Sequence, residues 1–228
     1  MEMNWSPLWI SLSVAIPATM ITFFLGIFIA KKVISANAPV SKLLDVIFTL
    51  PLVLPPTVVG FLLLILFGKN GLIGRFLYSV GIQIVFTRLA AIIAAIVVSF
   101  PLMYRSAKAA FEQQDGNLIQ AGRTLGLTKI QIFWRIEMPL AAPGILSGTI
   151  LTFARALGEF GATLMIAGNI PKITQTMPMA IYMNIQRGET KIASVWVLLM
   201  IMLSFFMILF LNFINIKKEE KGIHNITS

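Results

Sequence analysis

The sequence contains no cysteine and a single histidine among its 228 residues. Without cysteine the chain can form no disulfide, no thiolate metal site and no cysteine nucleophile. The one histidine, His224, lies in a polar stretch near the end of the chain, so a histidine metal cluster or a Ser-His relay cannot be assembled. We therefore expect neither enzymatic activity nor a metal site in this chain.

The sequence also lacks the phosphate-binding loop G-x-x-x-x-G-K-[ST] that an ATPase would need. The nearest approach, Gly68-Lys69, is followed by Asn70 and has no leading glycine. The chain is therefore expected to bind no cofactor of its own and not to hydrolyse ATP by itself.

Charged residues are scarce as well, at 12% of the chain, while 57% of the residues are hydrophobic. The mean hydropathy is +0.88. A water-exposed globular surface does not tolerate this balance, so the composition predicts an integral membrane protein surrounded by lipid. The net charge of +9 would suggest nucleic acid in a soluble protein. In a membrane protein it more often reflects basic residues in cytoplasmic loops, so no nucleic-acid partner is expected.

Five stretches are apolar over a length that can cross a bilayer. They cover residues 8–30, 44–67, 87–106, 145–167 and 192–214. The predicted fold class is an all-α integral membrane protein, with one transmembrane domain over residues 1–228. Between the second and third spans, a half-apolar region that holds Lys69 and Arg75 is interpreted as an interfacial loop with a short helix. A sixth span there is the alternative, and residues 217–228 are expected to form a polar tail.

The placement of Lys and Arg predicts the orientation, because cytoplasmic segments are enriched in both. Lys and Arg are more numerous in the cytoplasmic segments than in the outer ones when the N-terminus is placed outside and the C-terminus in the cytoplasm. The inner segments would then hold Lys31, Lys32, Lys42, Arg105, Lys108, Arg123, Lys129, Arg135, Lys217, Lys218 and Lys221, and the outer segments Lys69, Arg75, Arg88, Lys172, Arg187 and Lys191. We expect a multi-pass protein of the cell membrane.

A cytoplasmic loop is predicted over residues 107–139. Its pattern indicates a short helix ended by Gly126, a residue type that readily adopts the left-handed conformation after a helix. Thr128 can cap a second short helix, which Pro139 would stop before the fourth span. This hairpin could rest on lipid headgroups through Arg123, Lys129 and Arg135. The alternative is a docking element for a soluble partner.

The loop resembles the Glu-Ala-Ala signature of ABC importer permeases. Gln120-Ala-Gly122, Gly126, Ile136 and Met138-Pro139 follow the spacing of that signature, with Gln for the usual Glu, Gly for the second Ala and Met for Leu. The resemblance implies a coupling helix that docks on a cytoplasmic ABC ATPase, which would carry the ATP and Mg²⁺. The residues implied in coupling are Gln120, Ala121, Gly122, Arg123, Gly126, Ile136 and Pro139.

Three further stretches are similar to molybdate-type permeases, and sulfate and tungstate permeases look similar across them. The first two are residues 50–60 and 99–106. The third lies within residues 153–178 and consists of the segments 153–162, 167–171 and 174–178. The resemblance implies a type I ABC importer permease that moves molybdate or a similar oxyanion, delivered by an extracytoplasmic binding protein. The alternative is a self-sufficient ion channel or an ion-coupled secondary carrier.

Helix-breaking prolines and one charged pair indicate where a pathway could lie. Pro51, Pro55 and Pro56 remove backbone donors near the start of the second span, so the helix must start late or break there. Arg155 and Glu159 are four residues apart in the fourth span and can neutralise each other on one helix face. The pair could border a gate or could lock helices together, and both interpretations stay open.

Small residues recur on the fourth span, and a homodimer is expected. Gly144 and Gly148, then Ala154 and Gly158, have the four-residue spacing that permits close helix contact, and Gly161 follows. Packing within one chain explains them, and so does a moving two-fold interface. Five transmembrane helices are too few to enclose a transport pathway, so a second copy of the chain is expected to complete that pathway.

Overall fold

The computed structural model describes residues 4–224, with side chains described as far as residue 210, and is built from helices. The transmembrane elements are α1 (Ser6–Ile34), α2 (Ala38–Val53), α3 (Pro56–Phe67), α5 (Arg88–Glu112), α8 (Met138–Leu157) and α11 (Thr190–His224). The shorter elements are α4 (Leu72–Ser79), α6 (Gly116–Thr124), α7 (Lys129–Ile132), the π-helical turn η1 (Phe133–Glu137), α9 (Gly161–Ala167) and α10 (Met177–Gln186).

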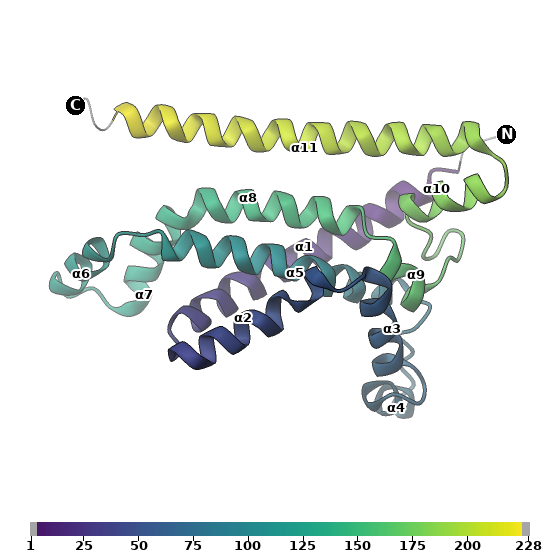
Figure 1. Ribbon diagram of the computed structural model, residues 1–228, viewed down its shortest axis with the longest axis horizontal. Helices are drawn as coiled ribbons and strands as arrows, with labels where there is room; N and C mark the ends of the chain where they lie inside the picture. The colour runs from purple at the N-terminus through teal and green to yellow at the C-terminus, as the bar shows by residue number, and fades with distance from the viewer. Residues whose placement is uncertain (1–3, 225–228) are drawn as a thin grey trace.

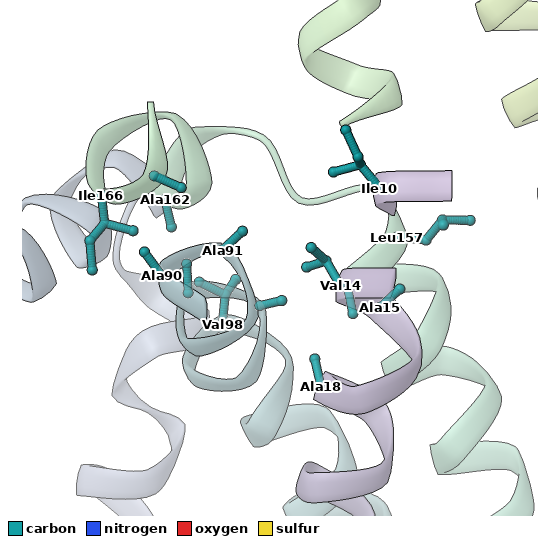
Figure 2. Close-up of a cluster of buried hydrophobic side chains, with 14 of the residues drawn as sticks. Ile10, Val14, Ala15, Ala18, Ala90, Ala91, Val98, Leu157, Ala162 and Ile166 are labelled. Atoms are coloured by element: carbon teal, nitrogen blue, oxygen red, sulfur yellow. The ribbon is translucent and has the colours of Figure 1, made fainter. Parts of the chain in front are cut away.

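Helices α1, α5 and α8 form the packed centre of the bundle, and α11 lies along one side of it (Figure 1). Small residues allow the close approach: a Cβ built on Gly26 would lie 2.7 Å from Cγ of Met103, where α1 meets α5. The buried core is lined largely by alanine and β-branched or leucine side chains, including Ala15, Ala91 and Val98 (Figure 2). Close packing of small side chains is the usual way helices associate in a bilayer.

Four helical segments within the described residues are long and apolar enough to cross a membrane. They are Ser6–Ile34, Arg88–Glu112, Lys129–Leu157 and Thr190–Phe210, and α2 with α3 makes a fifth if the bent pair counts as one span. The predicted interfacial loop between the second and third spans contains α4, which has 8 residues. No sixth span is found there in the described chain.

The second span, predicted over 44–67, is broken at its prolines, as the sequence indicated. It consists of α2 and α3, which meet at an angle of 110°. Leu54 and Pro55 lie between them with extended backbone, and Pro56 is the first residue of α3. The break follows from the two prolines, which supply no N–H for a helix that continues from α2.

The fourth span is also displaced from its predicted bounds of 145–167. One helical segment runs from Lys129 through η1 and α8, so Pro139 does not stop the second helix of the loop. The π-helical turn directly before Pro139 widens the helix and relieves the clash between the proline ring and the preceding turn. The same span ends early, at Leu157, and α9 follows after a short break.

The two ends of the bundle differ. Helices α6 and α7 project from one end, and α4, α9 and α10 lie toward the other (Figure 1). The N-terminus lies near the α10 end, and α11 runs back toward the α6 end (Figure 1). The predicted polar tail over 217–228 falls partly within α11, whose side chains beyond residue 210 lie outside the described part, as do residues 225–228.

Candidate functional site

The hairpin at one end of the bundle has the local structure that its sequence predicts. Asp115 caps α6 by accepting a hydrogen bond from the Asn117 N–H at 2.9 Å. Gly126 has φ +78° directly after this helix. Thr128 then caps α7 in a reciprocal capping box with Gln131. The two short helices are thus each fixed by their own caps, and the turn between them requires a residue that tolerates positive φ.

The residues implied in coupling divide into a buried and an exposed set. Gly122 is buried, and a Cβ built on it would lie 2.7 Å from Cδ1 of Ile136. Ile136, which is half-buried, packs its side chain against Gly122, so these two residues hold α6 against η1. The exposed set, which a partner could reach, consists of Gln120, Ala121, Arg123, Gly126 and Pro139.

An ion pair ties the base of the hairpin to α1, and sequence reasoning missed it. Nζ of Lys31 lies 2.6 Å from Oε1 of Glu137, whose side chain is 8% exposed. Gln114 donates from Nε2 to the backbone carbonyl of Glu137 at 2.7 Å. The hairpin is therefore attached to α1 and to the end of α5 through polar contacts of Glu137. The two partners are 106 residues apart, so no local pattern could have paired them.

The two helix breaks in the chain lie against each other. A Cβ built on Gly161, at the start of α9, would lie 3.2 Å from Cβ of Pro56, at the start of α3. One turn further, a Cβ on Gly60 would lie 2.6 Å from Cα of Ala162. The exposed surface of the first break includes Val53, which is 82% exposed. Non-helical backbone at bilayer depth is tolerated only where protein or water covers it, so this surface is a candidate pathway wall.

Arg155 and Glu159 form the predicted ion pair, with 2.6 Å between Nη1 and Oε2, but not on one continuous helix. Because α8 ends at Leu157, Glu159 lies in the break rather than in the span. Its Oε1 accepts a hydrogen bond from the Ala162 N–H at 2.7 Å, in the first turn of α9. The buried carboxylate therefore joins the end of α8 to the start of α9, next to the α3 break. Gly158 is the C-cap residue of α8, and Gly161 is the first residue of α9.

A second polar cluster fastens α2 to α5. Asp45 accepts hydrogen bonds from the Tyr104 hydroxyl and from Nζ of Lys108. Lys108 also lies 3.6 Å from Oε1 of Glu112, so one cation joins two carboxylates. Among the described residues α2 buries none of its own side chains. This cluster, together with the Phe48 ring packed against the Phe100 ring, holds the helix in place.

The small residues of α8 face α5 of the same chain. A Cβ built on Gly144 would lie 2.8 Å from Cβ of Ala110, and one built on Gly148 would collide with Ser106. These glycines are therefore explained by packing within the chain. A Cβ on Gly158 would meet a backbone atom of its own helix at 3.5 Å.

Comparison with known proteins identifies relatives of this architecture. The family described as "Binding-protein-dependent transport system inner membrane component" matches residues 22–218. The putative molybdenum transport system permease protein YvgM of Bacillus subtilis is 44% identical over 91% of this chain and 92% of its own. The molybdenum transport system permease protein ModB of Escherichia coli is 46% identical over 80% of each. A bacterial ABC transporter that imports the acidic polysaccharide alginate shares the fold, with a TM-score of 0.78, 17% identity and coverage of 95% and 80%.

Proposed function

Because the chain belongs to the family of binding-protein-dependent transport system inner membrane components, we propose that it transports molybdate, or a closely similar oxyanion, into the cytoplasm. The chain is a permease subunit and not an enzyme, and ATP is hydrolysed by a separate subunit. The single observation that carries the choice of ion is the identity of 44–46% to two permeases named for molybdenum transport. Tungstate and sulfate are the competing cargoes.

Coupling to a cytoplasmic ABC ATPase is proposed to run through the hairpin of α6 and α7. The exposed residues Gln120, Ala121 and Gly126 would contact the ATPase, whereas Arg123 lines a pocket beside the end of α1. Gly122 and Ile136 would keep the hairpin rigid. Movement of the hairpin would reach α1 through the Lys31–Glu137 pair. ATP binding can drive transport only if the ATPase has different affinities for the two states of the permease.

A second copy of the chain is proposed to complete the pathway. The surface around the break between α2 and α3 is exposed in the single chain, and extended backbone there cannot face lipid. A homodimer would cover this surface with protein and leave a water-filled path between the copies. Arg155 and Glu159 lie behind the break and would position its wall rather than bind the ion tightly.

The proposed orientation places the α6–α7 end in the cytoplasm and the N-terminus outside. It is supported by the basic residues near the hairpin and by the opposite placement of the N-terminus (Figure 1). The α9–α10 end would then face an extracytoplasmic oxyanion-binding protein. There, Arg88 donates to the carbonyls of Ile173 at 2.8 Å and Lys172 at 3.0 Å, which fixes the outer loop.

Reconstitution tests this function. We expect uptake of radiolabelled molybdate into liposomes only when the chain, its ATPase, the binding protein and ATP are all present. Parallel assays with tungstate and sulfate rank the ions. Uptake that proceeds without the ATPase would favour the channel or ion-coupled carrier instead.

A further inference from the structure

A pocket of about 430 Å³ lies where α1 ends beside the hairpin. The basic residues Lys31, Arg123 and Lys129 line it, and Glu137 is its one carboxylate. That carboxylate is already paired with Lys31. Arg123 and Lys129 form no ion pair within the described residues, so the pocket carries an excess of positive charge that an anion would compensate.

The rest of the pocket wall is apolar and aromatic. Ile132 and Phe133 contribute to it, and so do Ile130 and Trp134, which are 72% and 63% exposed. An inorganic anion in water needs no such wall. A molecule with an anionic head and an apolar body matches both halves of the lining, since the head would meet the cations and the body the exposed ring and aliphatic side chains.

The depth of the pocket matches the headgroup layer of a bilayer. The apolar run of α1 ends at Ala30, and Lys31 and Ser35, one turn apart on the helix that follows, line the pocket. Four residues of helix correspond to about 6 Å. The headgroup layer on each side of a bilayer is about 5–7 Å thick. An exposed tryptophan at this level is typical of a membrane interface.

The geometry points to a specific site for the phosphate of an anionic phospholipid, with Arg123 and Lys129 on the phosphate and Trp134 beside the acyl chains. This inference rests on the membrane placement proposed above but not on the identity of the transported ion. A lipid bound here would bridge α1, α6 and α7 and so stiffen the connection between the hairpin and the membrane helices.

Native mass spectrometry of the full chain, titrated with phosphatidylglycerol or phosphatidylcholine, tests the site. The double variant R123Q/K129Q should lower the preference for phosphatidylglycerol by roughly 25-fold, since each cation near the surface contributes roughly fivefold. The matched control K42Q/R135Q removes two exposed charges that do not line the pocket. It should keep the preference. Equal losses in both variants, or none in R123Q/K129Q, would overturn the proposal.

Two further arms separate the lipid from other occupants. If millimolar sodium phosphate or sodium molybdate displaces phosphatidylglycerol, the site belongs to a free oxyanion and the lipid assignment is wrong. If addition of the ATPase expels the bound lipid, the pocket is part of the ATPase contact, and the lipid assignment is equally wrong. Retention of the lipid in both arms supports it. Because lipid binding is measured without transport, failure here leaves the uptake test of the permease function unaffected.

Discussion

Gly60 of α3 and Ala162 of α9 pack backbone against backbone, since a Cβ on Gly60 would lie only 2.6 Å from Cα of Ala162. This contact joins the second halves of the two broken spans. It keeps the helix breaks beside each other, and with them the surface that we propose lines the pathway.

Replacement of Gly60 by alanine should therefore destabilise the protein by about 1–3 kcal/mol, because the clashing neighbour is backbone and cannot move aside. The measurement is the apparent melting temperature of the purified chain in detergent. Gly116→Ala is the matched control, because no heavy atom lies within 4 Å of its added Cβ. An unchanged melting temperature for Gly60→Ala would contradict the contact.

Gly126 offers a test of coupling. With φ +78° and open space around it, this position rejects a β-branched side chain by conformation rather than by collision. Gly126→Val should abolish ATPase stimulation and uptake while membrane insertion persists. Gly126→Asn should retain most of both, because asparagine tolerates the left-handed region. If the valine variant couples normally, the hairpin is not the docking element.

Glu137 should be needed to attach the hairpin. Glu137→Gln leaves Lys31 without its partner, and since Lys31 is about one-third exposed, water offsets part of the loss. We expect a cost of about 1–2 kcal/mol in thermal unfolding and weaker ATPase stimulation. The exchanged pair Lys31→Glu with Glu137→Lys should recover part of both. Lys32→Gln, a neighbouring exposed cation, serves as control; a loss of equal size in that variant would argue against the pair.

Substitution of Glu159 distinguishes a structural role of this carboxylate from a role in the transport pathway. It is 3% exposed, pairs with Arg155 and caps α9, so Glu159→Gln should lower the unfolding free energy by about 1–3 kcal/mol. Molybdate uptake should fall only in proportion to the folded fraction. Uptake lost from a fully folded, thermally unchanged variant would instead place the carboxylate in the pathway itself.

The class of the protein and its local elements follow from the amino-acid sequence alone. Apolar runs located the spans because burial in lipid leaves little choice of side chain. The hairpin was predictable because its signals are local: Thr128 caps one helix and Gly126 ends the other. The break after Val53 was indicated by prolines, which act within one turn.

How these elements meet depends on contacts between segments far apart in the chain. Pro139 was predicted to end a helix, yet the helix continues past it after a π-helical turn. The break after Leu157 was not predicted, because the glycines and the one carboxylate that follow it do not by themselves end a transmembrane helix; Glu159 holds the break by capping the next helix. The Lys31–Glu137 and Asp45–Lys108 pairs join residues 106 and 63 positions apart. Long-range pairs like these depend on which helices become neighbours, and hydropathy, which is a property of each segment alone, carries no information about neighbours.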